Sequence, residues 1–277
     1  MTDTLFENQP RNDIYLLVCI VFGILFFLCL FLLLRSRNGN FWGWLALGLF
    51  SALKVSGSAI NLYTNHEILE NKTPSTGLIT AGYVLLGIAL SPLILTAMQL
   101  ISTGTSGVQA PIISYFHKII GRLLVVAAAV LAIVGITKQD SAYDSGSTNT
   151  TGLVLLKVSS IVYVVAFVYV LGLAILCHRF VGSRYDNACV PYLYAVYIAT
   201  PFFVVRLVYN VISSFTYTSD IFAPHKFSVY SGSWSIYLGM VVIMEIVIAI
   251  IFVVSGFTVH LGGRRYVPEE AYEPKYL

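Results

Sequence analysis

The sequence has few charged residues for its length. Only 10% of its 277 residues are Asp, Glu, Lys or Arg, and these comprise 16 basic and 13 acidic side chains. A soluble domain carries about a quarter charged residues, so this chain has too few to cover a water-exposed surface. The composition excludes a soluble enzyme and a disordered regulator. Together with the small net charge of +3, it also excludes a nucleic-acid binder as the function class.

Side chains that hold metals and cofactors are equally scarce. The chain has four cysteines, too few for a disulfide framework, and its five histidines fall in loops or at the ends of apolar runs. No paired carboxylates and no Asp-rich motif occur inside an apolar run. The last apolar run has no lysine, so it offers no retinal Schiff base. The sequence therefore predicts neither a metal site nor a cofactor.

Long apolar runs are what the sequence has in abundance. Hydrophobic residues make up 57% of the chain, and the mean hydropathy is +0.82. Seven runs are long enough to cross a bilayer as helices. They cover residues 14–34, 41–63, 77–101, 112–136, 152–177, 190–215 and 233–255. We therefore expect an all-α membrane protein with a seven-helix bundle over 14–256, an N-terminal tail over 1–13 and a C-terminal tail over 257–277.

The basic residues predict the orientation of this bundle, because cytosolic loops retain Lys and Arg. One side carries nine of them: Arg35, Arg37, Lys118, Arg122, Arg179, Arg184, Arg264, Arg265 and Lys275. The other side carries four: Arg11, Lys72, Lys138 and Lys226. We expect the N-terminus outside or in the lumen and the C-terminus in the cytosol, in the plasma membrane or the endoplasmic reticulum. The glycosylation sequons at Asn71 and Asn149 then both fall on the outer side.

Apart from Lys118 and Arg122, which lie in the cytosolic part of the fourth run, four charged residues lie inside the apolar runs: Lys54, Lys157, Arg206 and Glu245. Charges within a bilayer are rare and costly, so each of them is a functional-site candidate. Lys157 lies near the outer end of its run, where a long side chain can reach the headgroups. The other three lie much deeper, and we take them as the core of a candidate site.

Polar residues extend from two of these charges along single helix faces. The two stripes consist of Ser51, Lys54, Ser58 and Asn61 in one run, and of Arg206, Tyr209, Asn210 and Ser213 in another. Both run from mid-membrane towards the outer side. They indicate either a cavity that opens outward or hydrogen-bonded contacts between helices.

Glu245 lies on an entirely apolar helix face. A lone carboxyl group there must be paired with a cation or protonated. Its run follows that of Arg206 along the chain, so the two helices are expected to be neighbours. We therefore expect Arg206 to pair with Glu245, with Lys54 in reach of the same place. One cation is then left over, and either an anionic ligand or a neutral lysine would balance the charge.

Two prolines fall inside predicted helices. Pro92 lies in the third run and Pro201 in the sixth. Proline removes a backbone donor and its ring meets the carbonyl four residues earlier, so each should kink its helix. The kinks can be static or can serve as hinges.

Three stretches resemble a family of fungal seven-helix membrane proteins that carry a domain of unknown function. They are GIALSPLIL from Gly87, PFFVVRLVY from Pro201, and the Met244–Glu245 step. In outline the chain is also similar to fungal lipid-translocating proteins of the aminocholesterol-resistance type. The resemblance implies a small-molecule or lipid context, often near secondary metabolism, and it assigns no catalytic residue.

These observations leave three functions open. The first is binding or translocation of an anionic or lipid-like amphiphile at Lys54, Asn61, Arg206, Tyr209 and Asn210. The second is an intramembrane cyclase or isomerase of a terpenoid or polyketide, with Glu245 as the catalytic proton donor. The third is a receptor-like sensor. The expected partners are membrane lipids and a hydrophobic or amphiphilic small molecule, with no nucleic acid, and no protein partner is indicated.

Overall fold

The computed structural model describes residues 3–35, 40–70, 72, 75–104, 115–144, 150–181, 190–216, 227 and 232–261. Helices account for nearly all of these residues, and none of them is in a strand. Seven helical segments within the described ranges are long and apolar enough to cross a membrane. The predicted all-α membrane fold with seven spans is therefore confirmed.

Five of the spans are single helices. They are α1 (Asp3–Arg35), α2 (Phe41–Leu69), α5 (Tyr115–Asp144), α6 (Thr150–Val181) and α7 (Val190–Thr216). The third span is divided into α3 (Thr76–Ile88) and α4 (Leu90–Gly104). The last span consists of α8 (Trp234–Tyr237), the π-helical η1 (Leu238–Ile243) and α9 (Met244–Leu261).

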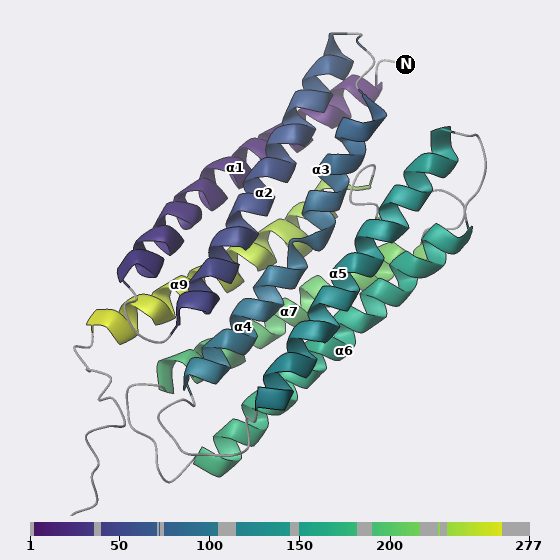
Figure 1. The fold of residues 1–277 in the computed structure, drawn as a ribbon. Coiled ribbons are helices and arrows are strands. Elements are labelled where there is room, and N and C mark those ends of the chain that lie inside the picture. Colours follow the sequence, from purple (N-terminus) through teal and green to yellow (C-terminus); the bar gives the residue numbers. More distant parts are fainter. Residues whose placement is uncertain are drawn as a thin grey trace, which may run out of the picture.

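The helices lie side by side along one long axis (Figure 1). The hairpin of α1 and α2 lies on one flank and the hairpin of α5 and α6 on the other, with α3 and α4 between them and α7 and α9 behind. The third span is the most buried of the seven, because α4 packs against α2, α5, α6 and α7. It forms the centre of the bundle.

The helix break at Ala89 explains why the third span is two helices. Pro92 cannot donate to the carbonyl of Ile88, and its ring crowds that carbonyl. The helix is interrupted directly after Ile88, which confirms the predicted kink. Pro201 has a milder effect, since α7 continues through it without interruption.

Helix ends extend beyond the apolar runs. The structure extends α2 to Leu69 and α5 to Asp144, past the predicted ends at 63 and 136. It also carries α1 back to Asp3 and α9 on to Leu261, into the predicted tails 1–13 and 257–277. Hydropathy detects only the part of a helix that lies in hydrocarbon, whereas a helix can continue into the polar interface. At the end of α2, for example, Asn65 donates to the side chain of Asn12 on α1.

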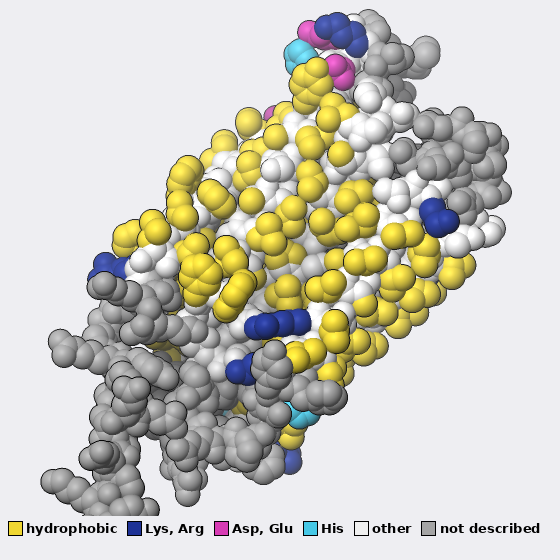
Figure 2. Space-filling model, in the orientation of Figure 1, with side chains coloured by type: hydrophobic (Ala, Val, Ile, Leu, Met, Phe, Trp, Pro, Cys, Tyr) yellow, Lys and Arg dark blue, Asp and Glu magenta, His cyan; other side chains and the backbone are white. Residues whose placement is uncertain are grey.

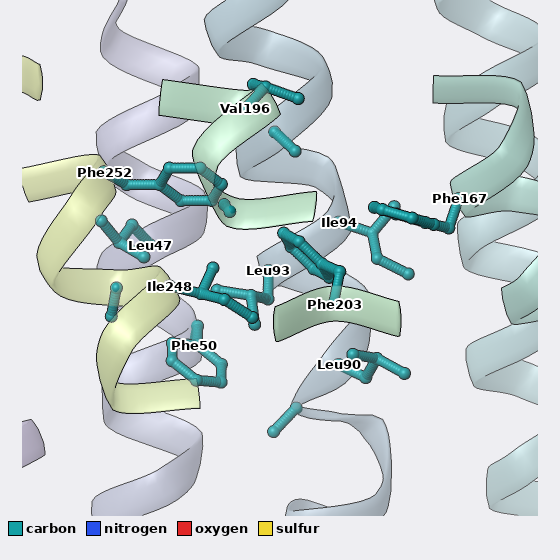
Figure 3. Packing of buried hydrophobic residues seen from close by; sticks show 14 of the residues in the cluster. Leu47, Phe50, Leu90, Leu93, Ile94, Phe167, Val196, Phe203, Ile248 and Phe252 are labelled. Atoms are coloured by element: carbon teal, nitrogen blue, oxygen red, sulfur yellow. The ribbon is translucent and has the colours of Figure 1, made fainter. Parts of the chain in front are cut away.

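One hydrophobic core runs through the middle of the bundle. Aromatic rings from three helices meet there, and Phe203 of α7 lies with its ring centroid 4.9 Å from Phe167 of α6 and 6.2 Å from Phe252 of α9. Leu93 and Ile94 of α4 fill the space beside Phe203 (Figure 3). This packing fixes α4, α6, α7 and α9 relative to one another. Two of these helices, α7 and α9, carry buried charges.

The outer surface of the bundle is apolar between its two ends. Figure 2 shows hydrophobic side chains covering most of the visible side of the described chain. Large residues such as Phe27, Leu123 and Val168 are exposed on it. A soluble protein rarely exposes such an extent of apolar surface, whereas lipid tails match it.

Candidate functional site

Three charged side chains from three helices meet inside the bundle. Glu245 lies on the first turn of α9 and is completely buried. Lys54 reaches it from the middle of α2, and Arg206 reaches it from α7. Both cations are also buried, with Lys54 only 2% exposed. We call Lys54, Arg206 and Glu245 the charged triad.

Each oxygen of the Glu245 carboxylate faces one cation. The Nε of Arg206 donates to Oε1 over 2.8 Å, and the Nζ of Lys54 lies 2.5 Å from Oε2. The contact of Arg206 is a charge-assisted hydrogen bond, the strong class of hydrogen bond, and that of Lys54 is an ion pair. The predicted pairing of Arg206 with Glu245, with Lys54 in reach, is confirmed. Because α2 and α9 come from opposite ends of the chain, the triad also joins the two ends of the sequence.

The triad holds more positive than negative charge. Two cations share one carboxylate, which leaves an excess of one positive charge when all three groups are ionised. The Nη1 of Arg206 is buried and has no acceptor within the described part of the chain. A buried donor without a partner costs about 1–3 kcal/mol, and more when it is charged. The arrangement can therefore accommodate an additional anionic acceptor at the guanidinium group.

The face of α2 that carries Lys54 continues towards the C-terminal end of the helix as a polar stripe. Ser58 and Asn61 are buried on it, and neither Ser58 Oγ nor Asn61 Nδ2 finds a hydrogen-bond partner among the described residues. Gly82 of α3 lies against Asn61, and a Cβ at this position would come within 2.8 Å of Asn61 Oδ1. The missing side chain at Gly82 thus leaves room for the Asn61 amide between α2 and α3.

Three buried tyrosines lie beside the triad. Tyr237 of α8 is close enough to interact electrostatically with Glu245, Arg206 and Tyr209. The ring of Tyr15 of α1 contacts Tyr237 edge-on, with centroids 6.4 Å apart. All three tyrosines are buried. Their hydroxyl groups give this region polar contacts in an otherwise apolar bundle.

The structure brings together some of the predicted site residues but not all. Lys54, Arg206 and Glu245 are in contact, and Tyr209 is buried one helical turn from Arg206. Asn61 lies two turns from Lys54, against α3, and Asn210 is only half-buried. The sequons at Asn71 and Asn149 lie outside the described residues. Lys157 is half-buried near the N-terminal end of α6, with its Nζ 5.7 Å from the ring centroid of Phe215.

The position of Tyr237 beside Glu245 could not be predicted from helical periodicity. Glu245 is eight positions after Tyr237, which in a regular α-helix places the two side chains about 80° apart around the axis. The π-helical turn Leu238–Ile243 lies between them and takes up about one extra residue. The angular difference then falls to about 20°, and both side chains face the core. The apolar run LGMVVI contains no signal for this turn apart from Gly239.

Metal-ligating side chains do not cluster in the described chain. No group of three or more His, Cys, Asp or Glu side chains is close enough to hold a metal ion among these residues. The triad is the only buried cluster of ion pairs within the described ranges, since Glu70 meets His66 and Lys72 at the exposed end of α2.

Comparison with known proteins identifies a family but no characterised relative. No curated protein and no solved structure matches the chain. One family model matches residues 9–261, which include all seven spans and the whole triad, and it describes a domain of unknown function, DUF7702. The resemblance to a family with a domain of unknown function is thus confirmed, whereas a fungal source and a likeness to lipid-translocating proteins stay predictions. The chain, with its seven membrane-length helices, belongs to the DUF7702 family.

Proposed function

We propose that this protein binds an anionic amphiphile within the membrane, with the anionic group of the ligand at Arg206. The single observation that carries the proposal is that two basic side chains share one carboxylate while Nη1 of Arg206 has no partner in the described chain. A carboxylate or phosphate supplies both the missing negative charge and the missing acceptor. The polar atoms of Ser58 and Asn61 offer further contacts on the outer side of the triad.

The geometry favours this function over catalysis by Glu245. A proton donor needs an oxygen that carries a proton and points at the substrate. Both oxygens of Glu245 already face cations, at 2.5 and 2.8 Å, so a proton on either would displace one of these contacts. Glu245 is better suited to hold the two cations in place while one of them binds the ligand.

The test measures what co-purifies with the protein in mild detergent, by quantitative mass spectrometry of the extracted lipids. We expect the wild type to retain at least one anionic amphiphile per chain. Lys54→Met removes the excess charge and leaves the Arg206–Glu245 pair intact, so retention should fall about tenfold. Lys157→Met is the matched control, because it removes a lysine near the outer end of α6.

Two results would contradict the proposal. One is the absence of any anionic amphiphile from the wild-type preparation. The other is equal retention by Lys54→Met and the wild type. Chemical conversion of the retained compound by the wild type, but not by Glu245→Gln, would instead support the enzyme hypothesis.

A further inference from the structure

A second group of unpartnered buried donors lies at the beginning of α2. The indole Nε1 of Trp44 and the amide Nδ2 of Asn40 are both buried, and neither has a hydrogen-bond partner in the described chain. Asn40 immediately precedes α2, and Trp44 follows one turn later on the same face. This place is ten residues, or about 15 Å, along α2 from Lys54, so it is separate from the charged triad.

The surrounding contacts hold both side chains in position. The Oδ1 of Asn40 lies 3.1 Å from the hydroxyl of Thr103 on α4, which is also 2.9 Å from the carbonyl of Gln99. The Nδ2 of Asn40 has no partner in the described chain. The absent side chain of Gly43 leaves space for the Asn40 amide, and the absent side chain of Gly256 on α9 leaves space for the Trp44 ring. The two donors are therefore fixed by packing between α2, α4 and α9.

The helix end itself adds positive potential. Asn40 makes no side-chain cap to the backbone, and α2 has no acidic residue in its first turn. The first N–H groups of α2 therefore lack a side-chain acceptor, and the positive end of the helix dipole is not offset there. Arg35, at the end of the neighbouring α1, is the nearest basic residue along the described chain.

The chemistry of these atoms selects an oxyanion over water. Nε1 of an indole only donates, and Nδ2 of an amide only donates. A water molecule at either donor could accept from it, but its own hydrogens would then need acceptors. An anionic oxygen needs donors alone, and the positive end of α2 favours its charge.

The depth in the membrane identifies the source of that oxyanion. Phe41 and Trp42 are exposed on the outside of the same turn, Trp42 by 64%, and exposed aromatic residues at a span end lie at the headgroup level. The acidic group available at that depth in a bilayer is the phosphate of a phospholipid. We propose that Asn40, Trp44 and the first turn of α2 bind the phosphate group of a membrane phospholipid.

The experiment uses the full chain in mild detergent and measures the unfolding midpoint and, by native mass spectrometry, the retained lipid. The probes are a phosphatidic acid, a diacylglycerol with the same acyl chains, and inorganic phosphate. The variants are Trp44→Phe, which removes one donor and keeps an aromatic ring, and Asn40→Asp, which keeps the acceptor for Thr103 and replaces the donor by an anionic oxygen. Trp42→Phe is the matched control on the exposed side of the same turn.

We expect phosphatidic acid to raise the unfolding midpoint of the wild type and of Trp42→Phe. Its affinity should be about tenfold lower for Trp44→Phe and lower still for Asn40→Asp. An equal effect of diacylglycerol would overturn the proposal, because the phosphate would then be irrelevant. An equal effect of inorganic phosphate alone would overturn the assignment to a lipid, and unchanged affinity in both variants would overturn the site.

Discussion

The charge balance at Glu245 determines how far each substitution in the triad lowers the free energy of unfolding. Removing Lys54 leaves a neutral pair of Arg206 and Glu245, and removing Arg206 leaves a neutral pair of Lys54 and Glu245. Removing the charge of Glu245 leaves two buried cations facing each other without a counter-charge. A buried pair broken from one side typically costs about 3–5 kcal/mol, because the remaining charge has lost its solvation.

We therefore expect Glu245→Gln to lower the free energy of unfolding by about 3–5 kcal/mol. Lys54→Met should lower it clearly less, since the 2.8 Å contact between Arg206 and Glu245 persists. Denaturant unfolding in detergent micelles measures both values, with Lys157→Met as a control outside the triad. Equal losses for Glu245→Gln and Lys54→Met would show that charge balance does not govern stability at this place.

A second prediction concerns the coupling between Arg206 and Glu245. Glu245→Leu leaves two cations, and adding Arg206→Leu removes one of them, so the double variant should be more stable than Glu245→Leu alone. The interaction free energy from the double-mutant cycle should lie at the upper end of the usual range, about 2–3 kcal/mol. Strictly additive losses would mean that the two side chains do not interact in the folded protein.

The sequence predicts the triad because charges are rare inside apolar runs. Only Lys54, Arg206 and Glu245 lie far from the span ends, so these three charges had few alternative partners. The sequence contains no comparable signal for Trp44 or Tyr237, because an aromatic residue in an apolar run is ordinarily part of the core packing. The unpartnered donors of Arg206 and Trp44 depend on the relative placement of whole helices, and no single-helix pattern contains that information.

At the scale of the helices, η1 determines which way Glu245 points. The π-helical turn Leu238–Ile243 directly precedes α9, and it takes up about one residue more than an α-helical turn. Deleting Gly239 should convert this turn to regular α-helix and leave Tyr237 and Glu245 about 20° apart, because seven α-helical positions give the same rotation. Deleting Leu238 as well should rotate one side of the span by about 100° relative to the other. The span would then be unable to present Tyr237 and Glu245 to the core together.

We expect deletion of Leu238 and Gly239 together to destabilise the protein by at least as much as Glu245→Leu, and deletion of Gly239 alone to cost clearly less. A further control is Gly239→Ala, because a Cβ at Gly239 meets no other atom within 4 Å. Thermal unfolding of the purified variants in detergent is the measurement. A double deletion as stable as the wild type would show that the register of η1 is not what positions Glu245.

Two glycines in the spans make opposite predictions for the same substitution. A Cβ at Gly256 of α9 would lie 2.3 Å from Trp44 Cη2 and 2.5 Å from Cζ2, and this ring is fully buried. A Cβ at Gly172 of α6 would meet nothing within 4 Å. Gly256→Ala should cost about 1–3 kcal/mol by overpacking, whereas Gly172→Ala should be neutral or slightly stabilising because alanine favours the helix. A comparison of their unfolding midpoints decides between these outcomes.

The existence of the helices is predictable from the sequence, but their ends are not. Each of the seven apolar runs corresponds to one observed span, because an apolar stretch of about 20 residues has no other stable structure in a bilayer. The ends of α2 and α5 lie beyond the apolar runs, in polar sequence where hydropathy carries no signal. The break at Ala89 was predictable from Pro92, whereas η1 contains no residue that enforces a π-turn.

At the scale of the whole molecule, the triad depends on chain segments that are far apart in sequence. Lys54 comes from the second span and Glu245 from the seventh, and they meet only when the bundle is closed through α7 and α4. Loss of the triad should therefore weaken the association of the first hairpin with the last span. The same closure places α1 beside α9, so the two ends of the bundle sequence are neighbours in space.

The orientation of this closed bundle is the last prediction. The helices alternate in direction, so the C-terminal ends of α1, α4, α6 and α9 share one end of the molecule (Figure 1). Exposed basic residues at this end are Arg35, Arg122 and Arg179, whereas the opposite end combines its lysines with Asp13 and Glu70. Because cytosolic loops retain Lys and Arg, we expect the end of α9 to face the cytosol.

A C-terminal glycosylation reporter tests this orientation in eukaryotic cells. It should stay unmodified, while the same reporter at the N-terminus should acquire glycan. Asn149, which directly precedes α6 at the opposite end, should carry glycan as well, so that Asn149→Gln increases the gel mobility. If Asn149 is unmodified, the two reporters alone decide the orientation, because a sequon can remain unused. Glycan on the C-terminal reporter would reverse the orientation and place the phospholipid site of Asn40 and Trp44 in the outer leaflet.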